Sequence, residues 1–214
     1  MGDIQKTQKP RSHFGISYNA PVILTFTLLS TGILAIGQLI PGFVSNYFTV
    51  PPRGAGFNIF SLQFFRLFSH ALGHASWSHL IGNFTFILLI GPILEEKYGS
   101  GLLLLMMFIT ATVTGILNVL FFPNGLLGAS GIVFMLILLS SVTNYKTRKV
   151  PLTFILIVLL YVGQEVYRAI FDPNNNISEF AHIMGGFCGG FFGFFFRGKK
   201  SGQNSNQETY TSGE

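Results

Sequence analysis

Long runs of apolar residues, separated by short polar breaks, make up most of the chain. Six of these runs approach or reach the ~20 residues that a helix needs to cross a hydrocarbon core of ~30 Å. They cover residues 20–40, 78–94, 101–121, 129–145, 150–168 and 180–196. The pattern therefore predicts an all-α membrane protein built as a bundle of six transmembrane helices.

The polar breaks predict how these helices are connected. No charged residue occurs between Tyr98 and Tyr145, and the turn residues Pro123, Asn124 and Gly125 lie in the middle of that stretch, so we expect a helical hairpin there. The longer break, residues 41–77, contains the aromatic run FNIFSLQFFRLF. This composition favours an outer loop that lies in the membrane interface between spans 1 and 2.

Composition supports the membrane assignment, and charge orients the chain. Of the 214 residues, 49% are hydrophobic and 10% are charged, whereas soluble domains carry about 25% charged residues. The 13 Lys and Arg residues occur in small groups and form no basic face, which argues against a nucleic-acid partner. Most of them fall on the side of the two termini. The positive-inside rule then predicts a multi-pass protein of the cell membrane with both termini in the cytoplasm.

The two ends of the chain are polar. We expect residues 1–19 and 198–214 to be cytoplasmic tails, the latter disordered, and residues 20–197 to form one membrane domain. The single cysteine, Cys188, excludes an internal disulfide and offers no metal-ligand spacing. We therefore expect neither a redox site nor a zinc site.

Four polar residues inside the predicted spans are expected at nearly the same depth. His79, Ser130 and His182 each lie about 15 or 16 positions from the charged residue that ends their span, which corresponds to ~22–24 Å of helix. Asn83 lies one turn from His79 on the same helix face. An unpaired polar group in hydrocarbon costs several kcal/mol, so this layer should face the bundle interior or a water-filled cavity.

Such a layer has the groups that acyl transfer needs. Ser130 and His182 could form a nucleophile and its general base if their helices approached closely. Small residues beside both would permit that approach. These residues are Gly128, Gly131, Gly185 and Gly189. Ser130 is also expected to begin a helix, so its amide and the side chains of His79 and Asn83 could donate to one oxyanion.

Three motifs carry a resemblance to a known family. G-x-S-G at residues 128–131, H-x-x-x-N at 79–83 and A-H-x-x-G-x-x-x-G at 181–189 together resemble the rhomboid intramembrane serine proteases. The resemblance implies a six-helix fold over about residues 20–197, a Ser130–His182 dyad, and an oxyanion hole made by His79, Asn83 and the Ser130 amide. It also implies cleavage of single-pass transmembrane substrates, favouring small residues at the cut, at a site that opens to the outer side of the bilayer. The resemblance further implies that the reaction needs no metal and no cofactor.

The chain departs from the family pattern at two aromatic positions. Phe65-Arg66 stands where the family often has Trp-Arg, so Arg66 is expected to anchor the outer loop without the indole donor. Phe134 stands where a tyrosine often stacks under the histidine, so the ring is kept and the hydroxyl is lost. Neither change removes an atom that makes or breaks a bond.

Each feature also has a simpler interpretation. Serine and glycine commonly pack membrane helices together, and intramembrane histidines commonly relay protons. A small proton-coupled transporter using His79, His182 and Glu165 is therefore one alternative, and a rhomboid-like protein that binds membrane helices without cutting them is another. The latter should lack Ser130 or His182, and this chain has both. The oligomeric state stays open.

Three further polar residues are interpreted as structural. His70 and His74, just before the second span, are expected to bond loop backbone near the interface. Glu165 lies in the fifth span at the level of Ser130 and could complete a triad. Because Arg168 follows one turn later, we expect a paired or gating role for Glu165 instead.

Overall fold

The computed structural model describes residues 18–143, 152, 155–156, 159–160 and 179–196. Over these residues the chain is helical, and the one β contact is an isolated bridge between Val50 and Leu126. The elements are α1 (Pro21–Leu39), α2 (Phe43–Phe48), α3 (Gln63–Ser69), the 3₁₀ turn η1 (His70–Leu72), α4 (Trp77–Tyr98), α5 (Ser100–Phe121), α6 (Ser130–Thr143) and α8 (Glu179–Phe195). The all-helical prediction is therefore confirmed for the described part of the chain.

Five of the six predicted spans coincide with a helix. α1, α4 and α5 are long and apolar enough to cross a membrane, and α6 and α8 are shorter apolar helices. Most of the fifth predicted span, residues 150–168, lies outside the described residues. The count of six spans stays a prediction.

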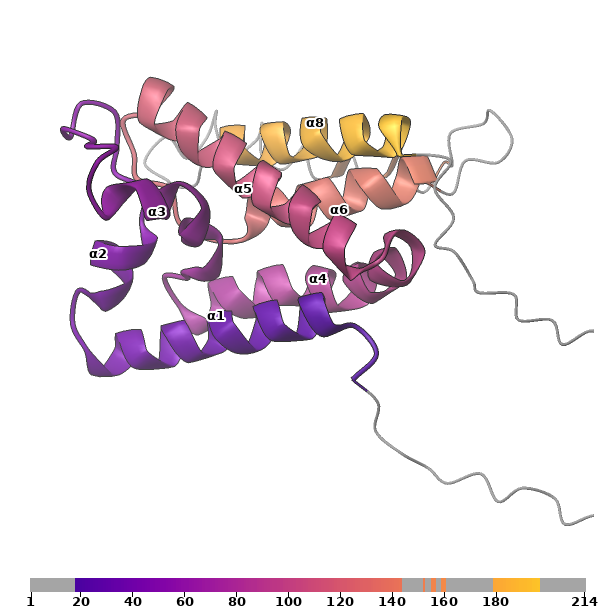
Figure 1. Cartoon of the computed structure of the whole chain (residues 1–214), viewed down its shortest axis with the longest axis horizontal. Helices are drawn as coiled ribbons and strands as arrows, with labels where there is room; N and C mark the ends of the chain where they lie inside the picture. Colours follow the sequence, from indigo (N-terminus) through magenta and orange to yellow (C-terminus); the bar gives the residue numbers. More distant parts are fainter. Residues whose placement is uncertain (1–17, 144–151, 153–154, 157–158, 161–178, 197–214) are drawn as a thin grey trace, which may run out of the picture.

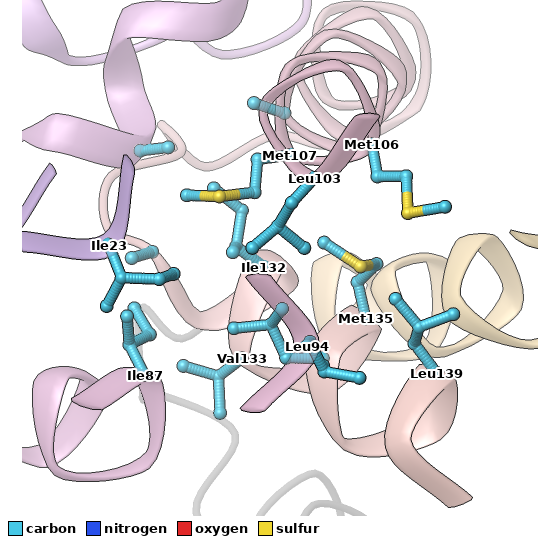
Figure 2. Close-up of a cluster of buried hydrophobic side chains, with 14 of the residues drawn as sticks. Ile23, Ile87, Leu94, Leu103, Met106, Met107, Ile132, Val133, Met135 and Leu139 are labelled. Atoms are coloured by element: carbon cyan, nitrogen blue, oxygen red, sulfur yellow. The ribbon is translucent and has the colours of Figure 1, made fainter. Parts of the chain in front are cut away.

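α1, α4, α5 and α6 belong to one bundle (Figure 1), and each contributes buried apolar side chains to its core. Figure 2 shows side chains from all four helices converging in one cluster. Its labelled members are Ile23, Ile87, Leu94, Leu103, Met106, Met107, Ile132, Val133, Met135 and Leu139. This core fixes the position of α6 relative to α4, and the candidate site depends on that relation.

Glu95 joins the start of α1 to the end of α4. Its buried carboxylate accepts hydrogen bonds from the backbone N–H groups of Val22 and Ile23, at 2.9 and 3.0 Å, and from the Ser100 hydroxyl at 2.7 Å. A carboxylate satisfies the free N–H groups of a helix N-terminus and favours its dipole. One acidic side chain thus links α1, α4 and the beginning of α5.

The segment between α1 and α4 contains short helices that pack against the bundle. A Cβ placed on Gly115 of α5 would collide with the backbone of Leu67 in α3, so the two elements touch backbone to backbone. Val50 and Leu126 exchange both backbone hydrogen bonds, at 2.9 and 3.1 Å. These contacts attach this segment to α5 and to the connection between α5 and α6. Phe60 and Phe65 of this segment remain exposed.

α6 and α8 run side by side (Figure 1) and pack more closely than side chains would allow. A Cβ on Gly185 would overlap the carbonyl of Gly131, and one on Gly189 would overlap the carbonyl of Met135. Small residues permit this backbone contact between membrane helices. Of the four glycines predicted to bring these helices together, Gly131, Gly185 and Gly189 are at the contact, and Gly128 lies against His79 of α4 instead.

Candidate active site

Ser130 is the first residue of α6. The loop before it turns at Gly128, whose φ of 116° is a conformation that residues with a side chain rarely adopt. The N–H of Gly128 donates to the carbonyl of His70 at 3.0 Å. Ser130 thus begins a helix as sequence analysis predicted, and the N–H groups in the first turn of a helix have no partner within the helix.

His182 lies in the first turns of α8 and is 7% exposed. Its imidazole stacks on the ring of Phe134, with centroids 4.7 Å apart and planes 7° apart. Phe134 is one turn after Ser130 on α6. The loss of the tyrosine hydroxyl at this position therefore leaves the ring stack in place.

The backbone contact between α6 and α8 involves the sequence neighbours of the serine and the histidine. A Cβ on Gly131, the residue after Ser130, would lie 3.3 Å from the carbonyl of Ala181, the residue before His182. Ser130 and His182 thus stand next to a pair of touching backbones on neighbouring helices. The structure brings both predicted residues to one side of the bundle.

α4 contributes the other two predicted residues. A Cβ on Gly128 would lie 2.6 and 2.7 Å from Cε1 and Nε2 of His79, and 3.7 Å from Nδ2 of Asn83. Both side chains therefore face the turn that precedes Ser130. His79 is also near enough to His182 for an electrostatic interaction between the two rings.

His74 is a site residue that sequence analysis assigned only to loop structure. It lies between η1 and α4, and its Nε2 is 3.1 Å from Nδ2 of Asn83. Its ring is 5.0 Å from that of His79, edge on. The predicted loop-backbone bond is present as well, because Nδ1 lies 3.4 Å from the carbonyl of Leu72. The pattern of the sequence contained no signal for the contact with Asn83, since the two residues are on different elements.

His70 lies next to the turn at Gly128, whose N–H donates to its carbonyl. Its Nε2 bonds the carbonyl of Ala111 in α5, at 3.1 Å, in place of the expected loop backbone. Burial lowers the pKa of His70 to about 4, against the bond to Ala111, which raises it. Burial, followed by the neighbouring His79, likewise lowers the pKa of His74 to about 4. Both imidazoles are therefore neutral at physiological pH.

Of the two remaining candidate residues, Arg66 is among the described residues and Glu165 is not. Arg66 lies half-buried in α3, and the contact that attaches α3 to the bundle is made by the neighbouring Leu67 with Gly115. Its role as the loop anchor stays a prediction. Glu165 and Arg168 lie outside the described residues.

Comparison with known proteins supports the family resemblance. Residues 61–199 match the family model of the rhomboid domain. A curated relative, rhomboid-related protein 2 of Mus musculus, is 33% identical over 138 residues, which cover 58% of this chain. The matched region covers 45% of that relative, so the chain spans about half of its length.

Proposed function

Because this chain belongs to the rhomboid family of membrane proteins, we propose that it is an intramembrane serine endopeptidase. It would cut transmembrane-helix substrates with a dyad of Ser130 and His182. The partners would be single-pass membrane proteins within the lipid bilayer. No metal or cofactor enters the proposed reaction.

One observation carries the proposal: the contact of Gly131 with Ala181 and Gly185, beside the stack of Phe134 on His182. Contacts between backbones of this kind bring the side chains at the start of α6 near the first turns of α8. The stack fixes the plane of the imidazole. A nucleophile and a general base require this kind of restraint, because proton transfer depends on hydrogen-bond distance and orientation.

The reaction would proceed in two steps. His182 takes the proton of the Ser130 hydroxyl as the oxygen attacks the peptide carbonyl, and the imidazolium then protonates the leaving amine. This leaves an acyl-enzyme on Ser130. His182 next deprotonates a water molecule that attacks the ester, which releases the new carboxyl end and regenerates the serine.

Three donors would stabilise the oxyanion in both steps. They are the Ser130 amide at the start of α6, the ring of His79 and the side-chain amide of Asn83. This assignment is supported by the position of the His79 and Asn83 side chains against Gly128, two residues before the nucleophile. Fixed donors directed at a developing charge are commonly the largest contribution in acyl transfer.

The proposed orientation follows from the charge distribution. The chain would cross the membrane several times, with both termini in the cytoplasm and the serine nearer the outer surface. A substrate helix would enter sideways from the bilayer, by way of the predicted fifth span, and unwind to reach Ser130.

Cleavage of a model substrate tests the proposal. The purified protein is placed in liposomes with a single-pass protein that has small residues near the outer end of its span, and products are identified by mass spectrometry. Loss of the serine or histidine in a soluble serine protease lowers kcat by about 10⁶. We therefore expect product from the wild type and none from Ser130→Ala or His182→Ala.

Ser141→Ala is the matched control, because Ser141 lies on the same helix and its hydroxyl bonds the carbonyl of Ile137 within that helix. It should cleave like the wild type. Product from Ser130→Ala at the wild-type rate would overturn the proposed dyad. A wild type that binds the substrate helix and never cuts it would instead be the non-catalytic relative named as the alternative.

A further inference from the structure

A short chain of hydrogen bonds connects the side chain of Asn83 through His74 to the backbone of Leu72. It runs from the carbonyl of Leu72 to Nδ1 of His74, at 3.4 Å, and from Nε2 of His74 to Nδ2 of Asn83, at 3.1 Å. A carbonyl can only accept, so Nδ1 carries the proton and Nε2 is the acceptor. The amide nitrogen of Asn83 then donates to His74.

The amide nitrogen of Asn83 has a second hydrogen. The same Nδ2 atom lies 3.7 Å from the position of a Cβ on Gly128, on the side of the turn that leads to Ser130. An amide group carries two N–H donors on its nitrogen and two lone pairs on its oxygen. With one hydrogen held by His74, the same nitrogen still has a second hydrogen to offer toward Gly128.

We propose that His74 is a positioning residue for the oxyanion hole: by accepting from Asn83, it makes the Asn83 side chain present a donor, and not its carbonyl oxygen, toward the turn at Gly128. This inference rests on the proposed function. It assigns a part in the reaction to a residue outside the motifs and outside the predicted membrane spans.

The environment of His74 keeps it an acceptor. The residue is 1% exposed, and burial holds the pKa of its imidazole at about 4. If Nε2 were protonated, Asn83 would have to turn its oxygen toward His74. The same oxygen would then face the turn at Gly128, where it would repel an oxyanion.

Two amide substitutions at position 74 separate positioning from loop structure. In His74→Asn the amide nitrogen occupies the place of Nδ1 and keeps the bond to Leu72, with no atom at the place of Nε2. In His74→Gln the amide reaches the place of Nε2 and retains an acceptor for Asn83. Removing one oxyanion donor typically costs about 10²–10³ in kcat, and two other donors remain. We therefore expect His74→Asn to lower kcat about 10- to 100-fold with little change in KM, and His74→Gln to retain most of the turnover.

A double-substitution cycle identifies the residue through which His74 acts. His74→Asn should have no further effect on kcat in an Asn83→Ala background, because the amide that His74 positions is then absent. Equal turnover by the Asn and Gln variants would overturn the proposal. So would a loss in the Asn83→Ala background as large as that in the wild type. If the wild type itself does not cleave the substrate, the proposed function fails instead.

The hydrogen-bond chain can also be tested without measuring cleavage. Nitrogen-15 NMR of labelled histidine, with the His74 signal assigned from its absence in His74→Gln, reports which ring nitrogen carries the proton. We expect a protonated Nδ1 and a bare Nε2 whose shift changes in Asn83→Ala. A protonated Nε2 would contradict the proposal even if cleavage is never observed.

Discussion

His70 is 3% exposed, and its ring donates to the carbonyl of Ala111 across the gap between η1 and α5. Its own carbonyl accepts from Gly128. A single residue therefore connects α5, the segment before α4 and the turn that precedes Ser130. Because the imidazole is buried, its charged form is disfavoured, and the fold should be sensitive to acid at this position.

We expect the protein to lose stability as pH falls from about 6.5 to about 4. The pKa of His70 is lowered from 6.5 to about 4 by burial, so in this window the unfolded chain binds a proton that the folded chain does not. Stability is fully present above the unfolded pKa and decreases as pH falls toward the folded one. A shift of this size corresponds to about 3 kcal/mol at the acid end of the window. The unfolding temperature in detergent, compared at about pH 7.5 and about pH 5, measures the loss.

His70→Gln is the control for that measurement, because glutamine can still donate to Ala111 and does not titrate. Its unfolding temperature should change less between the two pH values than that of the wild type. An equal change in both proteins would show that His70 is not a source of the acid sensitivity. His74 has a similarly lowered pKa, so part of the effect should persist in the variant.

The positions of candidate site residues could be predicted where a motif fixed them and could not where a tertiary contact did. Ser130, His79 and Asn83 stand out as polar groups within apolar runs, and the structure brings the α4 pair to the turn beside the serine. His74 does not stand out, because it lies in a polar break where histidine is ordinary. Its contact with Asn83 depends on how η1 and α4 meet, and no periodicity encodes that meeting.

Among the elements, the contact of α6 with α8 is the most restrictive. The two helices touch through Gly131 and Gly185, where the carbonyl of one residue occupies the space of a side chain on the other. Overpacking a filled site forces backbone shifts that cost about 1–3 kcal/mol or more. In this fold the same shift would also move His182 away from α6.

We expect Gly185→Ala to lower the unfolding temperature and to abolish cleavage. The cause is steric, because the new methyl group would overlap the backbone of Gly131. Gly190→Ala on the same helix is the matched control, since a Cβ there meets nothing within 4 Å. Thermal unfolding and cleavage are measured for both. Wild-type behaviour of Gly185→Ala would show that α8 does not pack on α6 in this way.

The long helices were easier to predict than the segment between the first two. Apolar length alone identified the regions of α1, α4 and α5, and Gly99, with a φ of 80°, separates the last two. The short helices α2 and α3 have no such signal. The position of α3 depends on the contact of Leu67 with Gly115. That contact requires α5, which is distant in the sequence.

At the scale of the whole molecule, the candidate site depends on three helices that are distant in sequence. Helix rise placed His79, Ser130 and His182 at one depth, and the structure joins their elements through Gly128, Gly131 and the stack on Phe134. A common depth follows from the rise per residue alone, and it stays a prediction. Which faces meet could not be predicted, because the four-helix core that orients α6 is a property of side-chain packing.

Reaction with a fluorophosphonate tests the central claim, that Ser130 is a nucleophile activated by His182, most directly. The reagent forms a covalent phosphonyl ester with an activated serine, and mass spectrometry of the digested protein identifies the modified residue. We predict an adduct on Ser130 of the folded wild type, little or none on that serine in His182→Ala, and an unmodified Ser130→Ala. An adduct on another serine that persists in Ser130→Ala, or no adduct on a wild type that cleaves its substrate, would contradict the account.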